Sequence, residues 1–360
     1  MELALLELEA PLKRIASTTD RALRELSTLG RGALWQQALR AVVAINQAPR
    51  HLLRPQLVLV GHLAAGGAGQ GTNVETFAAG VELLHLFMLV HDDVMDHATL
   101  RRGQPALRVV MARADPELPW LKIRDLAIVL GDVIYARSME LLLEGAQQAS
   151  AAFRTILTGA QRAGAGQFQD VLGWRGLEQR EEAASFRQAM IDKGAHHSFS
   201  APLAAGMLLA DAGAEVAAAM QWGIHAGVAF QALDDVRDLV SKAVDMGKDS
   251  LQDFREGRLS LPLFLLRQAV SPEQWEVLRA LRGHGVLSME DRMELFRLAR
   301  EHRLGERCSK QIAAELAAAE GLTDAVTGRT RAREALANVL CGLRALLDHV
   351  TAGREAWDIP

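Results

Sequence analysis

Apolar residues recur at intervals of three and four positions through most of this chain, which is the spacing of one face of an α-helix. Runs rich in valine, isoleucine, threonine and aromatic residues, which are typical of strands, are scarce. The pattern predicts an all-α fold. The predicted helices span about 20–47, 55–65, 74–97, 121–148, 151–173, 180–193, 197–210, 214–241 and 260–270, with several more between 272 and 350.

The composition is that of a chain with a substantial core. Of its 360 residues, 49% are hydrophobic and 23% are charged, and no long linker or low-complexity segment divides them. We therefore expect one helical domain over residues 1–360. The net charge is -4 without a basic patch, so we expect no nucleic-acid partner. Cys308 and Cys341 form no closely spaced pair, which argues against zinc or a disulfide framework.

The location of the protein is expected to be the cytoplasm. The N-terminal segment has no basic stretch that leads into an apolar one, as a secretory signal would. No uncharged apolar run reaches the roughly 18 residues that a membrane-spanning helix requires. We therefore expect no transmembrane segment.

Two aspartate clusters stand out against the apolar helices. The first closes the segment Leu89–Asp96, where Asp92 and Asp96 are four residues apart and so share a helix face, with Asp93 beside them. The second, in Phe230–Asp238, repeats the design with Asp234, Asp235 and Asp238. Two matching clusters could face each other across a cavity.

The clusters indicate a metal site. Three carboxylates at the end of an apolar helix repel one another, and six across one cavity would need cations or raised pKa values. A set of oxygen ligands suits magnesium, which keeps several waters and is completed by substrate phosphates. The alternative, a solvated acidic helix face, is reasonable for one cluster but disfavoured for two, because buried unpaired charge is costly.

Basic residues follow where a diphosphate would need them. A guanidinium group binds two phosphate oxygens at once through parallel hydrogen bonds, whereas a lysine ammonium acts as a point charge. A single residue of this kind is more often an ordinary surface residue. Together, these residues could bind the diphosphate whose magnesium ions the aspartate clusters would hold. They are Arg101 and Arg102 after the first cluster, Lys193 between the clusters, and Lys248 and Arg258 after the second.

With these motifs, the chain resembles the trans-isoprenyl diphosphate synthases, or polyprenyl synthetases. The resemblance covers about residues 40–275 and rests on both Asp-Asp-x-x-Asp clusters, Arg101-Arg102-Gly103-Gln104-Pro105, Gly131-Asp132, Lys193, Phe230-Gln231 and Gly247-Lys248. It implies an all-α isoprenoid synthase-type helical bundle around a central cavity, a homodimer, and about three magnesium ions per site. Residues 276–360 add helices without a recognisable motif.

The resemblance also implies a reaction: magnesium-assisted ionisation of an allylic diphosphate, then attack by isopentenyl diphosphate. Implied metal ligands or close supports are Asp92, Asp93, Asp96, Asp234, Asp235 and Asp238. Implied contacts to the allylic diphosphate are Arg101, Lys193, Gln231, Lys248 and Arg258. Implied contacts to isopentenyl diphosphate are His51, Arg54, His85 and Arg102. The catalytic set among these is Asp92, Asp96, Lys193 and Asp234.

The chain departs from the family pattern at several positions. His51 stands where a lysine is usual, and histidine is mostly neutral at pH 7, so we expect weaker, pH-dependent binding of isopentenyl diphosphate. Gly194 replaces a threonine, and Arg258 replaces a lysine. Phe87 and Met88 lie about one turn before Asp92, where a bulky side chain blocks a growing product in this family. We therefore expect a C15 or C20 product, with C20 favoured because only one of the two residues is aromatic.

Three alternatives stay open. A class I terpene cyclase uses a similar first cluster, but its second metal motif normally carries Ser or Thr and Glu, unlike Asp234–Asp238. A non-catalytic partner subunit of a synthase would have no need of two complete clusters. A generic helical cation-binding protein does not explain Arg101, Lys193 and Lys248.

Overall fold

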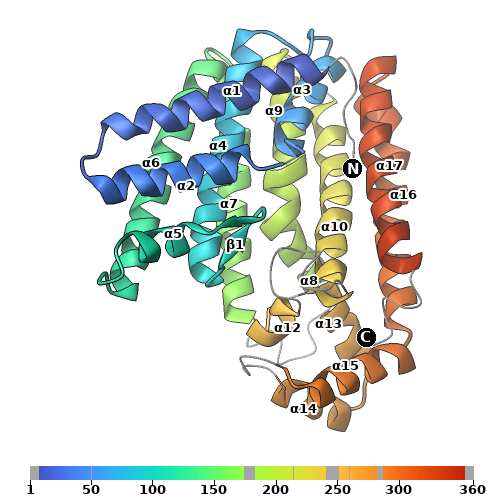
Figure 1. The fold of residues 1–360 in the computed structure, drawn as a ribbon. Helices are drawn as coiled ribbons and strands as arrows, with labels where there is room; N and C mark the ends of the chain where they lie inside the picture. The colour runs from blue at the N-terminus through green and yellow to red at the C-terminus, as the bar shows by residue number, and fades with distance from the viewer. Residues whose placement is uncertain are drawn as a thin grey trace. The chain divides into compact units, whose positions relative to one another are not determined.

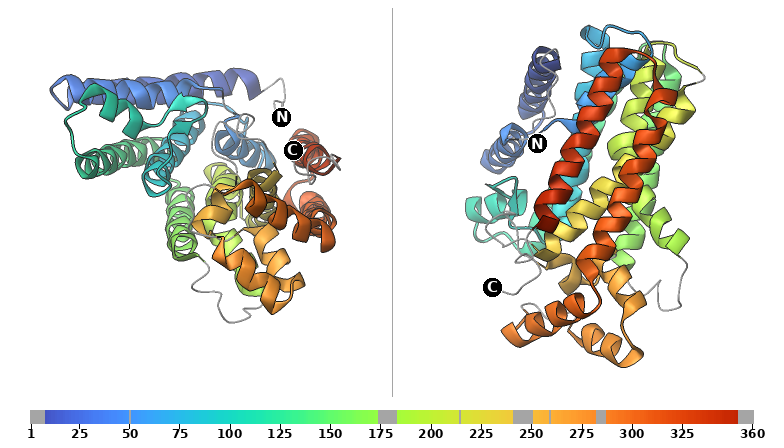
Figure 2. Two further views of the ribbon diagram at one scale, coloured as in Figure 1. Left: turned by 60° about the horizontal axis from the view of Figure 1, so that its bottom comes forward. Right: turned by 90° about the vertical axis from the view of Figure 1, so that its right-hand side faces the viewer.

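The computed structural model describes residues 8–49, 51–173, 183–213, 215–240, 251–258, 260–281 and 287–352. The prediction of an all-α fold is confirmed, because the described chain is almost entirely helical (Figures 1 and 2). The chain divides into two compact units. The N-terminal unit comprises Glu2–Ile156 with Pro202–Gly213, and the C-terminal unit comprises Leu157–Ala201 with Ala214–Pro360. The predicted single domain over residues 1–360 stays a prediction.

The N-terminal unit holds the first aspartate cluster. Its elements are α1 (Glu9–Glu25), the 3-10 turn η2 (Leu26–Thr28), α2 (Ala33–Gln47), α3 (Leu53–Ala64), α4 (Thr72–Met95), β1 (Leu100–Arg101), β2 (Gln104–Pro105), α5 (Leu107–Ala114), α6 (Trp120–Ala146), the start of α7 (Ser150–Leu172) and most of α9 (Ala201–Leu209). The long helices α4 and α6 pack along each other (Figure 1). The strands β1 and β2 form a small antiparallel hairpin after α4.

Helix α4 is apolar on nearly every side because it lies in the core of this unit. Its most apolar 18-residue window has a mean hydropathy of 1.4, which by length and composition alone would allow it to cross a membrane. However, 67% of that window is buried inside the protein. Burial therefore accounts for its composition.

The C-terminal unit holds the second aspartate cluster. Its elements are most of α7, then α8 (Ala183–Met190), the π-helix η4 (Ile191–Ser200), α10 (Val216–Val240), α12 (Gln252–Glu256), α13 (Leu261–Ala269), α14 (Pro272–Ala280), α15 (Met289–Glu301), α16 (Leu304–Val326) and α17 (Thr330–Ala352). Helices α16 and α17 lie side by side in both orientations of the molecule (Figures 1 and 2).

Two predicted helix boundaries are wrong. The predicted helix over 20–47 is two helices, α1 and α2, joined by η2 and a short turn, because Gly32 has a φ of 101°, which a residue inside a helix cannot adopt. The predicted break between residues 193 and 197 is absent, because η4 continues the helix in π geometry. The hairpin and the helices α5 and α12 were not predicted at all.

Candidate active site

The first aspartate cluster lies where α4 ends. The backbone N–H of Asp96 donates to the Asp92 carbonyl at 2.8 Å, which closes the last turn. Asp93 points into the core and is buried, whereas the Asp92 side chain is 30% exposed and Asp96 is half-buried. The three carboxylates are therefore not equivalent, and Asp92 and Asp96 are the two that a ligand can reach.

Arg101 of the hairpin binds this cluster directly. Its Nε donates to Asp93 Oδ1 at 2.6 Å, and its Nη2 donates to Asp92 Oδ2 at 3.1 Å. Burial raises the pKa of Asp93, and the positive charge of Arg101 offsets only part of that effect. For Arg101, burial would lower the pKa, but Asp93 and Asp92 hold it above its ordinary value. The residue predicted to bind the allylic diphosphate thus lies against two predicted metal ligands.

Arg102, the next residue, points to a different part of α4. It lies in the hairpin turn with a φ of 52°, and its Nη1 donates to the Ile45 carbonyl at 3.5 Å. Its Nη2 lies 3.9 Å from the Oε1 of Glu82, which is buried. His85, another residue predicted to bind isopentenyl diphosphate, is half-buried one turn after Glu82.

His51 and Arg54 lie where α3 begins, shortly after the end of α2. The His51 carbonyl accepts from the side chain of Gln56 at 2.7 Å, while its imidazole is exposed. Partial burial nevertheless lowers the pKa of His51. A lowered pKa favours the neutral imidazole, and the weaker, pH-dependent binding of isopentenyl diphosphate stays a prediction.

Phe87 and Met88 are both half-buried on α4. The Phe87 ring lies 4.6 Å from the His91 ring and 5.1 Å from the ring of Tyr135 on α6, measured between centroids. These contacts fix the position of Phe87 between the two helices. Its role as the floor of a product cavity stays a prediction.

The second aspartate cluster lies on the last turns of α10. Asp234 has a 46% exposed side chain with Arg237 3.6 Å away. Asp235 is buried and uses both carboxylate oxygens, accepting from Gln231 Nε2 at 2.9 Å and from the Leu261 N–H at 2.8 Å. Asp235 thus connects α10 to the start of α13, and Asp234 is the more accessible carboxylate.

Gln231, predicted to contact the allylic diphosphate, is positioned beside Gly194 of η4. A Cβ added at Gly194 would lie 2.8 Å from the Gln231 Oε1, so the amide occupies space that a threonine side chain would need. Close packing of η4 on α10 brings the two residues together. A Cβ at Gly227 of α10 would lie 2.5 Å from the Cα of Ala195, so only glycine permits this approach.

Lys193 and Arg258 meet at a residue that sequence reasoning missed, Asp170 of α7. Asp170 Oδ2 accepts from Lys193 Nζ and from Arg258 Nη1, both at 2.7 Å. A lone aspartate in Gly166–Asp170 gives no motif signal, and its partners lie 23 and 88 residues away. Lys248 lies outside the described residues.

The two clusters belong to different units, so their approach across a cavity stays a prediction. Within the described ranges, no three carboxylate, imidazole or thiol side chains converge to hold a metal without help. The reachable donors, Asp92, Asp96 and Asp234, are all carboxylates. Such donors fit magnesium, which takes its remaining ligands from water and phosphate oxygens.

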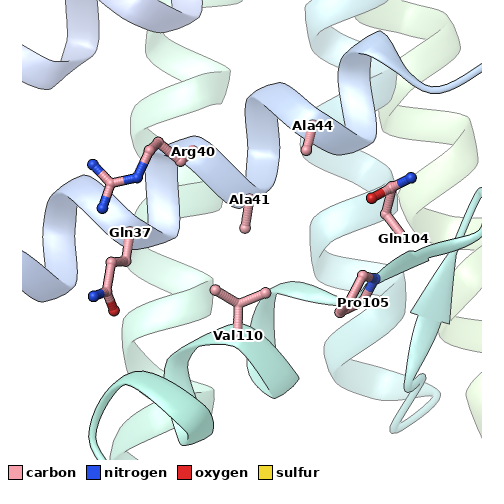
Figure 3. Close-up of a pocket in the computed structure, with 7 residues that line it drawn as sticks. All are labelled: Gln37, Arg40, Ala41, Ala44, Gln104, Pro105 and Val110. Carbon is pink, nitrogen blue, oxygen red and sulfur yellow. The ribbon is translucent and has the colours of Figure 1, made fainter.

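A separate hollow of about 290 Å³ lies in the N-terminal unit between α2, β2 and α5 (Figure 3). Figure 3 shows Gln37 and Arg40 toward one end and Gln104 toward the other, with Ala41 and Val110 between them. None of the residues that line it belongs to the predicted site. It borders the hairpin that carries Arg101 and Arg102.

The site thus combines an all-α fold with aspartates that close two apolar helices, and an arginine lies beside each cluster, Arg101 at the first and Arg237 at the second. The family model described as polyprenyl synthetase matches residues 36–298, so the chain belongs to the polyprenyl synthetase family. The predicted enzyme class, a trans-prenyltransferase, is confirmed.

Curated relatives and solved structures agree with this family. The chain is 28% identical to a short chain isoprenyl diphosphate synthase of Methanothermobacter thermautotrophicus, over 76% of this chain and 79% of the other. It is 29% identical to a geranylgeranyl diphosphate synthase of Saccharolobus solfataricus, over 70% and 73%. Another relative, 29% identical over 61% of this chain and 63% of its own length, is an octaprenyl diphosphate synthase of Haemophilus influenzae.

The fold is shared with a solved geranylgeranyl pyrophosphate synthase of Corynebacterium glutamicum, complexed with isoprenyl diphosphate and magnesium. The TM-score is 0.81 at 23% identity, with 96% of this chain and 99% of that chain covered. The predicted isoprenoid synthase-type fold is therefore confirmed.

Proposed function

We propose that this chain condenses an allylic diphosphate with isopentenyl diphosphate and releases a short-chain isoprenyl diphosphate of C15 or C20. The observation that carries the proposal is the pair of helix-end aspartate clusters. Asp92 and Asp96 are accessible in the first cluster, and Asp234 is accessible in the second. Carboxylates crowded at one helix end repel one another, so a cation bound between them is stabilising. The family match runs from residue 36 to residue 298, through both units, which supports their working as one domain.

Magnesium is the proposed metal, with about three ions per site. When bound between the carboxylates and a diphosphate, it would stabilise the charge that develops on the leaving group. Asp92, Asp96 and Asp234 would hold it. Asp93, Asp235 and Asp238 would support these ligands from the buried side of each helix, because all three are buried.

The remaining predicted residues would bind and orient the two substrates. Lys193, Gln231 and Lys248 would hold the allylic diphosphate, joined by Arg101 when phosphate oxygens replace its carboxylate partners. His51, Arg54, His85 and Arg102 would hold isopentenyl diphosphate. The chemistry needs no nucleophile from the protein, since the double bond of isopentenyl diphosphate attacks the allylic cation and the released diphosphate can take the proton.

Product length varies among the relatives, which include geranylgeranyl and octaprenyl diphosphate synthases. Phe87, fixed against Tyr135, supports a short product, because a large ring one turn before Asp92 would fill space that a longer tail requires.

A homodimer is supported by the exposed face of α6. Apolar side chains at heptad spacing are exposed along it, and a soluble protein rarely exposes such a row. They include Leu121, Ile128 and Tyr135, with Val129 and Leu143 alongside. We propose that a second copy covers this face, and that the protein works in the cytoplasm.

The deciding experiment gives the purified protein magnesium, isopentenyl diphosphate and a C5, C10 or C15 allylic diphosphate, with products read by mass spectrometry. A C15 or C20 diphosphate is expected, and Asp92→Asn should reduce turnover at least a hundredfold. Hydrocarbon from allylic diphosphate alone would instead support a terpene cyclase. No turnover of any pair would support a partner subunit.

A further inference from the structure

Asp170 is a buried charge outside the two aspartate clusters. It is 2% exposed on α7, and an ionised carboxylate so deep in a protein needs compensation. One oxygen, Oδ2, accepts from both Lys193 Nζ and Arg258 Nη1 at 2.7 Å. Asp170 is therefore the shared partner of two cations that come from different parts of the chain.

The two cations differ in what else they can reach. The Lys193 side chain is 26% exposed, so its ammonium can meet a ligand while it is held by Asp170. The Arg258 side chain is only 8% exposed, and its Nε donates to Glu256 at 2.7 Å. Arg258 thus lies between two carboxylates and is more deeply buried than Lys193.

In this arrangement Lys193 shares the Asp170 oxygen with a second cation. If Asp170 paired with Lys193 alone, the ion pair would cancel and attract a phosphate weakly. Because Arg258 draws on the same oxygen, each cation receives part of one negative charge. An ammonium held at a fixed place and open to solvent on one side is suited to bind an anion at a defined position.

The backbone brings Asp170 to this position. Gly166 lies one turn earlier on α7, and a Cβ added there would lie 2.3 Å from the backbone N of Lys193 and 2.5 Å from its Cα. Only glycine lets α7 approach η4 so closely. The next turn of α7 then places the Asp170 carboxylate beside the Lys193 side chain.

We propose that Asp170 is a positioning residue, which sets the place and direction of the Lys193 ammonium for the allylic diphosphate. Arg258 holds Asp170 through Nη1 from a buried position and does not itself touch the diphosphate. The assignment deepens the proposed function and rests on it only for the identity of the ligand.

The first test measures binding without turnover. Calorimetry gives the Kd of pyrophosphate in the presence of magnesium for the wild type, Asp170→Asn, Lys193→Met and the double variant. Loss of a positioned charge-assisted bond should weaken binding about tenfold in Asp170→Asn. In the Lys193→Met background, Asp170→Asn should raise the Kd of pyrophosphate by less than about threefold, because Asp170 acts through Lys193.

Kinetics supply the second readout. Asp170→Asn and Arg258→Gln should each raise the KM for the allylic diphosphate about tenfold, and should leave the KM for isopentenyl diphosphate within about twofold. Gly166→Ala keeps every charge but separates α7 from η4, so it should also raise the KM for the allylic diphosphate. The matched control is Arg162→Gln, which breaks a half-exposed pair with Asp192, 3.2 Å apart, between the same two helices and should change neither KM.

The outcomes separate the two proposals. Additive losses in the double variant, or an Arg162→Gln effect as large as that of Asp170→Asn, would overturn the positioning role. Should Asp170→Asn fail to fold, Gly166→Ala and Arg258→Gln carry the test alone, and unchanged pyrophosphate binding in both overturns it. A wild type whose pyrophosphate binding depends on Asp170 through Lys193, but which condenses no substrate pair, would refute the proposed function only.

Discussion

Glu315 of α16 accepts hydrogen bonds from two helices that lead to the candidate site, and its removal should cost measurable stability. Arg187 of α8 donates to it through Nε at 2.6 Å and Nη2 at 2.9 Å, and the His225 Nδ1 of α10 lies 2.6 Å from its Oε2. Burial alone would raise the pKa of Glu315, but the bonds from His225 and Arg187 hold it at about 2.

The magnitude follows from that pKa. The difference between 4.5, its ordinary value, and about 2 corresponds to about 3 kcal/mol of folding free energy at neutral pH. Because the folded-state pKa is lowered, this contribution is complete above pH 4.5 and is lost as the pH falls toward 2. Glu315→Gln should therefore destabilise the protein at pH 7, and the difference from the wild type should narrow between pH 5 and pH 3.

Thermal unfolding followed by circular dichroism measures the effect. For a cooperative unit of this size, about 3 kcal/mol lowers Tm by roughly 5–10 °C at pH 7. The matched control is Glu320→Gln on the same helix, where the carboxylate pairs with Arg344 at the surface and Tm should not change. Equal shifts for both variants, or a Glu315→Gln difference that stays constant from pH 7 to pH 3, would refute the reasoning.

Three further predictions concern the site and assembly. Partial burial lowers the pKa of His51, so it gains charge only in acid; the wild-type KM for isopentenyl diphosphate should rise from pH 6.5 to 8.5, and His51→Lys should lower it about fivefold at pH 8.5. If His51→Lys has the same KM for isopentenyl diphosphate as the wild type at both pH values, the predicted role of His51 is wrong. Phe87→Ala should lengthen the product by at least one C5 unit in mass spectrometry, whereas Phe168→Ala, on an exposed face, should not. Val129→Arg should convert a dimer into a monomer in sedimentation, whereas Leu29→Arg, exposed elsewhere, should leave the dimer intact.

Long helices could be predicted from this sequence because apolar spacing repeats over many turns. The pattern over 74–97 is α4 (Thr72–Met95) to within two residues at either end. Shorter elements could not be predicted the same way. The strands β1 and β2 have two residues each, too few for an alternating pattern, and η4 has the composition of an ordinary helix although its hydrogen bonds differ.

The candidate site was predictable where the residues form a spaced motif. Asp92 and Asp96 share a helix face by spacing alone, and the structure leaves both accessible. Asp170 was not predictable, because its importance comes from Lys193 and Arg258, which only the folded chain brings to it. Likewise, the spacing of the motif could not show that both carboxylate oxygens of Asp235 accept hydrogen bonds, one from Gln231 and one from the start of α13.

The hairpin after α4 carries two neighbouring arginines whose partners on that helix, Asp93 and Glu82, are separated by about 16 Å of helix axis. One turn, with Arg102 at a φ of 52° and Gly103 at 73°, supports both side chains. A diphosphate that draws Arg101 from its carboxylates would therefore alter the geometry around Arg102. Binding of the two substrates would then be thermodynamically linked, each changing the Kd of the other by the same factor.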